Sequence, residues 1–132
     1  MSLTAEQALR AYATMMNTLD VSCLEPLLAD EFHYASQWVF AEIESKTEYL
    51  SYIVQKLDTI RASSQSAWAE MAWLDREFPG PCVVMAQGDR ANLIALVLAK
   101  VENGKIQRLD LCAAPSPHSA RRTGDYPGLN VA

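Results

Sequence analysis

Residues 27–57 constrain the fold more than any other part of the chain, because a helix end, a short strand, a tight return and a helix start follow one another within them. Side chains alternate with period two between residues 32 and 38, which predicts a strand. One face of that strand carries Phe32, Tyr34, Ser36 and Trp38. Ser45–Thr47 can then cap a helix that continues to about residue 60. This order predicts a mixed α+β fold.

Helical signals precede this segment and strand signals follow it. Thr4 and Gln7 have capping-box spacing, which predicts a helix over residues 5–19, and a short helix with Pro26 in its first turn is expected near residues 24–28. Asn103–Gly104 is a hairpin dipeptide that makes its two flanking strands antiparallel. The strands are expected at residues 41–44, 67–74, 82–87, 91–101 and 105–112.

The fold class that follows is α+β, with a curved antiparallel or mixed sheet wrapped around about three helices from the N-terminal half. Residues 1–114 are expected to form a single cone-shaped domain, since neither an internal repeat nor a second domain is evident. After Ala114 the sequence becomes rich in Pro, Gly and Arg, with few core-forming residues. Residues 115–132 are therefore predicted to be a flexible or extended C-terminal tail.

Composition excludes several classes of function. The formal charge is −5 and no basic cluster is interleaved with aromatic residues, so we expect no nucleic-acid partner. No apolar run is long enough to cross a bilayer, and no secretory signal precedes residue 5, so we expect no membrane partner. The cysteines Cys23, Cys82 and Cys112 lack metal spacing and are read as small apolar residues. A cytoplasmic protein without a metal or cofactor is the expectation.

The element order resembles that of a cone-shaped superfamily. Leu28–Phe32 closes a helix and opens a strand, and Asn103–Ile106 forms a hairpin near the end of the domain. Over residues 4–113 this pattern resembles the nuclear transport factor two-like superfamily, which includes ketosteroid isomerase, scytalone dehydratase and the SnoaL-like polyketide cyclases. The resemblance implies a cystatin-like cone with a cavity at its open end. It also implies that the outer sheet face is covered, for example in a homodimer.

Ketosteroid isomerase allows a residue-by-residue comparison, because its chemistry uses a carboxylate base, a tyrosine and a neutral aspartic acid. The resemblance places the tyrosine at Tyr12, the base at Ser36 and the neutral acid at Leu96. A serine without an activating base cannot abstract a carbon-bound proton, and leucine donates no hydrogen bond. The chain therefore resembles a member of the superfamily that lacks the catalytic carboxylates of the isomerase.

Three other residues are considered for catalysis. Tyr34 with Ser36 could imitate part of a dehydratase site, but His33 alternates with Tyr34 and so points to the opposite face. Asp110 lies between Leu109 and Leu111, and it is expected to point outward and to pair with Lys100 or Arg108 if these leucines face the cavity. The carboxylates of Glu6, Glu25, Glu48 and Glu70 are all expected to be solvated.

The leading hypothesis is a small-molecule-binding domain whose apolar pocket takes a largely apolar ligand, with hydrogen bonds from Tyr12 and Ser36 and a flat wall from Trp38. One alternative is a lyase or isomerase that uses Tyr12 or Tyr34 as a proton donor and Asp110 as a first guess for the acid/base. Another is an interaction or dimerisation module whose cone is filled by its own side chains. The predicted pocket residues are Tyr12, Met16, Tyr34, Ser36, Trp38, Leu96 and Leu111.

Overall fold

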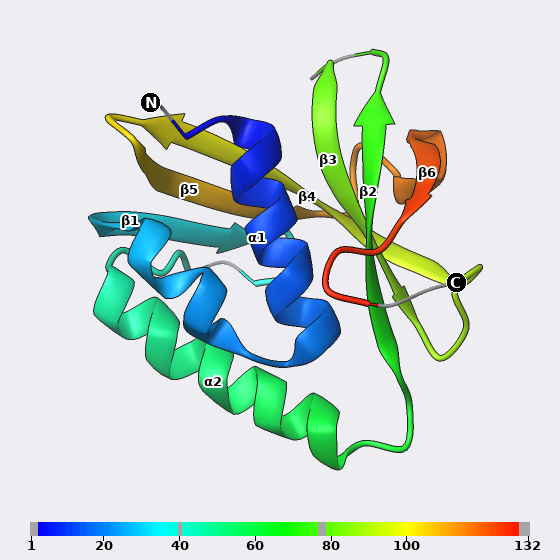
Figure 1. The fold of residues 1–132 in the computed structure, drawn as a ribbon, viewed down its shortest axis with the longest axis horizontal. Helices are drawn as coiled ribbons and strands as arrows, with labels where there is room; N and C mark the ends of the chain where they lie inside the picture. The colour runs from blue at the N-terminus through cyan, green and yellow to red at the C-terminus, as the bar shows by residue number, and fades with distance from the viewer. Residues whose placement is uncertain (1–2, 40, 77–78, 130–132) are drawn as a thin grey trace.

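The chain folds into a six-stranded mixed sheet with two long helices on one face (Figure 1). The computed structural model describes residues 3–39, 41–76 and 79–129. The strand order is β1-β5-β4-β3-β2-β6; β1 runs parallel to β5 and all other neighbours are antiparallel. The strands are β1 (Leu28–Ser36), β2 (Ala67–Leu74), β3 (Gly80–Gln87), β4 (Leu93–Glu102), β5 (Lys105–Cys112) and β6 (Arg121–Asp125). The predicted α+β class with a mixed sheet is confirmed.

Both long helices begin at the caps that the sequence predicts. Helix α1 (Ala5–Thr18) starts with the complete Thr4–Gln7 capping box, and helix α2 (Lys46–Ala62) starts where the Ser45 hydroxyl accepts a hydrogen bond from the Glu48 amide. The predicted short helix is wrong in type, because two 3-10 turns, η1 (Val21–Cys23) and η2 (Glu25–Leu27), fill that place. Strand β1 starts directly after them, at Leu28.

The main hydrophobic core lies between the two helices and the inner face of the sheet. Helix α1 packs against β2, β3 and β4, whereas α2 packs against β1. The largest fully buried side chains of this core include Tyr12, Tyr49, Phe32 and Leu9. On β1, Phe32 and Tyr34 face this core and are more buried than His33 and Ala35, which explains the alternation that predicted the strand.

Details of the sheet differ from the prediction at two places. Strand β1 begins at Leu28, before the expected residue 32. The expected strand at residues 41–44 is a single bridge, in which Tyr34 and Ile43 exchange two backbone hydrogen bonds of 2.8 and 2.9 Å. By contrast, the β4–β5 hairpin at Asn103–Gly104 is confirmed, with positive φ angles of 53° and 74° as a two-residue turn of this kind requires.

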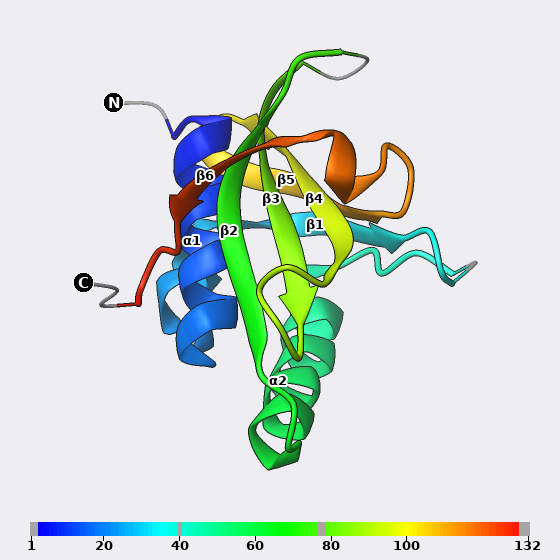
Figure 2. The ribbon, with the colours of Figure 1, turned by 90° about the vertical axis from the view of Figure 1, so that its right-hand side faces the viewer.

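The segment after Ala114 packs back onto the sheet. It crosses the outer face through the 3-10 turn η3 (Pro117–Ser119), whose Pro117 is buried, and then adds β6 to the edge of β2. Figure 2 shows η3 on the side of β4 opposite α1. Beneath it lies a second apolar cluster of Ala72, Leu74, Cys82, Val84, Leu96 and Cys112, with Ala120 packed against it. The chain itself thus covers part of the outer face that was expected to need a second subunit.

A buried ion pair holds β6 to the sheet. Glu70 of β2 is 3 % exposed, so the expectation that its carboxylate is solvated is wrong. Arg122 Nε donates to Glu70 Oε1 over 2.8 Å, the Gly124 amide donates to Oε2 over 2.7 Å, and the Tyr126 hydroxyl donates to Oε1 over 3.3 Å. A carboxylate taken out of water needs such partners, and here all of them come from the C-terminal segment.

Asn17 of α1 completes the edge of β2 where β6 ends. Its side-chain oxygen accepts a hydrogen bond from the Ala69 amide, and its nitrogen donates to the Ala69 carbonyl, both over 2.8 Å. The same nitrogen donates to the Pro127 carbonyl over 2.8 Å. One side-chain amide therefore substitutes for a neighbouring strand and also ties the C-terminal segment to α1.

The two adjacent arginines of β6 allow a matched test of the buried pair. Arg122→Ala should lower the free energy of unfolding by about 1–3 kcal/mol, because it removes the main partner of the buried Glu70 carboxylate, while the Arg122 side chain is itself 38 % exposed. Arg121→Ala should cost less than about 1 kcal/mol, because its pair with Asp75 is 65 % and 55 % exposed. Urea unfolding measures both values. Equal losses of unfolding free energy in the two variants would show that backbone hydrogen bonds to β2, and not the ion pair, hold β6.

Candidate functional site

A cavity of about 670 Å³ opens between α1, α2 and the inner face of the sheet. Helix α1 contributes Tyr12 and Met16 to its wall, and α2 contributes a stripe that runs from Tyr52 to Ser63. Most of the remaining wall is apolar and comes from the sheet and the loop after β1. These side chains include Trp38, Val39, Met85, Ile94, Ala95 and Leu111.

Five of the seven predicted pocket residues line this cavity. They are Tyr12, Met16, Ser36, Trp38 and Leu111. Tyr34 is 4 % exposed and lies behind the wall, where it packs against Tyr49 and Tyr52. Trp38 is 55 % exposed, which places it at the mouth rather than deep inside. Because Ser36 lines the cavity, the position that the isomerase resemblance assigns to the base holds a hydroxyl.

Leu96 does not lie at the cavity. It belongs to the outer apolar cluster, while its neighbours Ala95 and Val97 face the helices. The reason is the alternation of β4, which sends adjacent side chains to opposite faces. A shift of register opposite Ala86 lets Ile94 join Ala95 at the cavity, so β4 contributes two consecutive residues there. The sequence gives no sign of this irregularity.

Tyrosine side chains gather along one wall of the cavity. The ring centroids of Tyr34 and Tyr52 are 5.5 Å apart, and those of Tyr34 and Tyr49 are 5.2 Å apart. Burial raises the pKa of Tyr12 and of Tyr49 well above the ordinary value, and the same holds for Tyr34 with smaller contributions from Tyr12 and Tyr52. These phenols therefore stay protonated and can donate hydrogen bonds, but they cannot act as bases near neutral pH.

Sequence reasoning assigned Tyr49 and Tyr52 no role in the pocket. The buried hydroxyl of Tyr49 has no hydrogen-bond partner among the described residues. Tyr52 lines the cavity with 37 % exposure. A signal existed in the spacing of Tyr49, Tyr52 and Lys56, which helical periodicity brings to neighbouring positions of α2.

Acid/base groups are scarce at the cavity. Of the described residues that line it, none carries a carboxylate or an imidazole, and Lys56 is the one with a formal charge at neutral pH. Proton abstraction from carbon needs a positioned base, and neutral tyrosines cannot supply one. The arrangement can hydrogen-bond and enclose a molecule, but the described wall does not contain a conventional general base.

Asp110, the first guess for an acid/base, lies on the outer face as alternation predicted. Its carboxylate accepts two hydrogen bonds from Arg108 Nε, over 3.0 and 3.1 Å. Arg108 also holds Glu42 with two bonds of 3.0 and 3.1 Å, and Glu42 contacts His33 Nδ1 over 2.5 Å. This four-residue network ties the loop after β1 to β5. The predicted pairing of Asp110 with Arg108 is confirmed.

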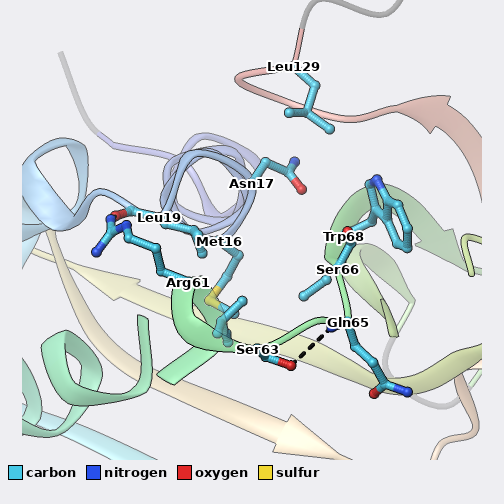
Figure 3. A pocket seen from close by; sticks show the side chains of 11 residues that line it. Met16, Asn17, Leu19, Arg61, Ser63, Gln65, Ser66, Trp68 and Leu129 are labelled. Atoms are coloured by element: carbon cyan, nitrogen blue, oxygen red, sulfur yellow. Dashed lines mark hydrogen bonds between the residues drawn. The ribbon is translucent and has the colours of Figure 1, made fainter. Parts of the chain in front are cut away.

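A smaller opening of about 370 Å³ adjoins the cavity at the C-terminal end of α2. Both share Met16, Ile60, Ser63, Gln65 and Ala67. Figure 3 shows Leu129 of the C-terminal segment above Asn17 and Trp68 at this opening. The folded-back segment therefore forms one rim of the side opening.

Residues 3–39, 41–76 and 79–129 contain no cluster of side chains that could hold a metal ion. No group of three metal-binding side chains occurs in these ranges, and none of the helices described there is long and apolar enough to cross a membrane. Burial raises the pKa of both Cys82 and Cys112 to about 11, which suits the small apolar role predicted for them.

Comparison with solved structures identifies the fold. A candidate polyketide cyclase from Pseudomonas putida shares 13 % identity at a TM-score of 0.60, over 89 % of this chain and 97 % of that one. An NTF2-like protein of unknown function from Cytophaga hutchinsonii shares 15 % identity at 0.58, over 89 % and 96 %. An LEH-like epoxide hydrolase from M. tuberculosis shares 13 % identity at 0.55, over 81 % and 80 %. Neither a family model nor a curated protein sequence matches the chain.

These similarities extend over nearly the whole of each compared chain, so they concern the complete architecture and not a local motif. Another neighbour is described as a cystatin-fold protein. The chain shares the α+β fold of these NTF2-like and cystatin-fold structures, as the resemblance in element order predicted. At identities of 12–15 % the likeness identifies the fold and leaves the chemistry to be argued from the cavity.

The Glu42 network should make stability depend on pH. Hydrogen bonds from His33, and then from Arg108, lower the pKa of the Glu42 carboxyl below its ordinary value of 4.5. A carboxyl with a lowered pKa in the folded state stabilises that state at neutral pH, and this contribution is lost as the pH falls through the folded-state pKa. Glu42→Gln should therefore lower the urea midpoint near neutral pH, and the difference from wild type should shrink at about pH 3.

Glu44→Gln is the matched control, because Glu44 is exposed and lies two residues away on the same segment. Its urea midpoint should follow that of the wild type at both pH values. A deficit of Glu42→Gln that stayed constant with pH would show that the network contributes by packing and not by charge.

Proposed function

We propose that the cavity binds a largely apolar small molecule. The observation that carries this proposal is the cavity itself, whose volume of about 670 Å³ falls within the range of about 300–1,000 Å³ typical of ligand sites. Its wall combines apolar side chains with a few hydroxyl groups, the usual composition of a small-molecule site. A filled cone, the third alternative from the sequence, would leave no such volume.

Different lining residues would contact the polar and the apolar parts of the ligand. Tyr12 lies deep in the wall at 2 % exposure, and its protonated hydroxyl can donate to an oxygen of the ligand. Ser36 Oγ already accepts a hydrogen bond from the Trp38 amide over 3.3 Å, which leaves its own proton free to donate. Trp38 and Ile94 supply apolar surface at the mouth. Met16, Leu111 and Met85 complete the interior.

A lyase or isomerase is the second candidate function, and the tyrosine wall favours it. Protonated phenols next to a cavity can stabilise negative charge that develops on a substrate oxygen. The compared structures described as a candidate polyketide cyclase and an epoxide hydrolase support enzymatic chemistry on this fold. The opposing observation is that neither a carboxylate nor an imidazole lines the cavity among the described residues. Binding is therefore the function that this wall supports better.

The homodimer and the cytoplasmic location remain predictions. A second copy that docked on the outer sheet face would meet the residues of η3 and a charged network, because the apolar cluster of that face is already buried. The network consists of His33, Glu42, Arg108 and Asp110. A dimer through this face would therefore rest more on polar contacts than on a large apolar patch.

Native mass spectrometry of freshly purified protein tests the binding proposal, since it reports the mass of any bound molecule and the number of subunits together. Thr59→Trp places a large side chain at the exposed edge of the cavity and should remove most of the bound molecule. Gln55→Trp makes the same kind of change on an exposed position of α2 outside the cavity lining and should leave binding intact.

The two variants separate a specific cavity from adventitious binding. Equal retention of a small molecule by both would place it somewhere other than the cavity. If wild-type protein carries no molecule, titration with an uncharged apolar probe tests whether the cavity binds ligands. Failure of that probe to bind would contradict the proposal.

A further inference from the structure

We propose that the ligand carries an anionic head group that pairs with Lys56 at the mouth of the cavity, so that the molecule bound is an amphipathic acid. This inference rests on the proposed function and specifies its ligand class. It starts from one side chain: among the described residues that line the cavity, Lys56 is the one with a formal charge at neutral pH.

Lys56 has no ion-pair partner within the described part of the chain. Eight ion pairs occur there, and none of them includes Lys56. Its ammonium group lies 5.9 Å from the ring centroid of Tyr52, one turn earlier on α2, at the long end of the range for a cation–π contact. Asp58 is already bound to Arg61 over 3.0 Å. A half-buried cation is therefore left facing a cavity in a chain whose net charge is −5.

Polar groups surround Lys56 on one side of the mouth. Thr59 follows it three residues later on the same face of α2, and Ser63, the C-cap residue, also lines the cavity. Beyond the end of the helix, Gln65 Oε1 accepts a hydrogen bond from Gln87 Nε2 over 2.9 Å, which leaves the Gln65 amide nitrogen as a free donor.

The wall contributed by the sheet and by the loop after β1 is mostly apolar, with Ser36 and Gln87 as its polar residues. Trp38, Val39, Ile94 and Leu111 approach from the sheet and from the loop after β1. A molecule that fills this space thus meets one positive charge, on the α2 side of the mouth, and mostly apolar side chains over the rest of the wall. An amphipathic acid has the same division of chemistry.

The groups at the cavity wall favour a negative charge on the ligand. The tyrosines are neutral donors, and no carboxylate among the described residues balances Lys56 at the cavity. An apolar wall lowers the local dielectric constant, which strengthens a pair between the ammonium and an anion. Lysine acts as a point charge and binds carboxylate, sulfonate or phosphate alike, so the shared feature is a single anionic head.

Two fluorescent probes with a common skeleton test the proposal. Anilinonaphthalene sulfonate carries an anionic group, and N-phenylnaphthylamine has the same aromatic framework without it. Lys56→Met keeps most of the side-chain volume and removes the charge. This variant should weaken binding of the sulfonate about tenfold, as expected for a lost charge-assisted contact, and leave the uncharged probe within about twofold.

Lys46→Met is the matched control, because it removes the same charge from the same helix at a position outside the cavity lining. Both probes should bind this variant as they bind wild type. If Lys56→Met weakens both probes equally, or neither, the anion proposal is wrong while cavity binding stands. If neither probe binds wild type, cavity binding is contradicted, and the anion proposal with it.

Competition with aliphatic ligands then distinguishes the source of the anion. Decanoate and decyl phosphate should each displace N-phenylnaphthylamine from wild type at lower concentration than decanol does. The advantage of both anions should disappear in Lys56→Met and fall as salt is added. Displacement by decanoate alone would narrow the class to carboxylates, displacement by decyl phosphate alone would narrow it to phosphate esters, and an equal effect of decanol would overturn the inference.

Discussion

The structure depends on a geometric constraint: two helices cover the inner face of one curved sheet, and they rest on different strands. Helix α1 lies across β2, β3 and β4, while α2 lies against β1 (Figure 1). Buried side chains fill the space where both helices approach the sheet, among them Tyr12, Tyr49 and Phe32. Toward the C-terminal end of α2 the filling stops and the cavity begins. The pocket is thus a consequence of how the core is packed.

The outer face follows a different principle, because the chain closes part of it with its own C-terminal segment. Glu70 is the centre of this arrangement. A buried carboxylate is costly unless it is paired, and its partners Arg122, Gly124 and Tyr126 all lie after residue 120. The same segment packs Pro117 and Ala120 over the apolar cluster that contains Leu96 and brings Leu129 to the side opening. The C-terminal residues therefore belong to the fold and to the rim of the site.

Local signals in the sequence predicted local structure well. The Thr4–Gln7 capping box, the Asn103–Gly104 turn and the alternation around Asp110 each involve neighbouring residues, and each appears as predicted. The two largest failures involve distant partners. Glu70 reads as solvated until Arg122, fifty-two residues later, is placed beside it. The segment after Ala114 resembles a tail in composition, although residues 117, 120 and 129 make apolar or rim contacts in the structure.

The pocket was predictable in outline and not in detail, for the same reason. The isomerase resemblance pointed to Tyr12 and Ser36, which line the cavity, but it also pointed to Leu96, and alternation along β4 turns that side chain to the other face. The register shift that brings Ile94 inward has no sequence signature. Tyr52 and Lys56 could have been found from their helical spacing to Tyr49, had that face of α2 been considered as a wall and not only as a core.

The central claim is that the open end of the cone is a binding site, and methionine methyl groups report on it directly. Met16 and Met85 line the cavity, whereas Met15 and Met71 are buried in the core outside its lining. A protein labelled with carbon-13 at the methionine methyl groups can be titrated with N-phenylnaphthylamine and followed by NMR. The account predicts saturable shifts of the Met16 and Met85 resonances and little change at Met15 and Met71. Shifts confined to Met15 and Met71, or none at saturating probe, would contradict it.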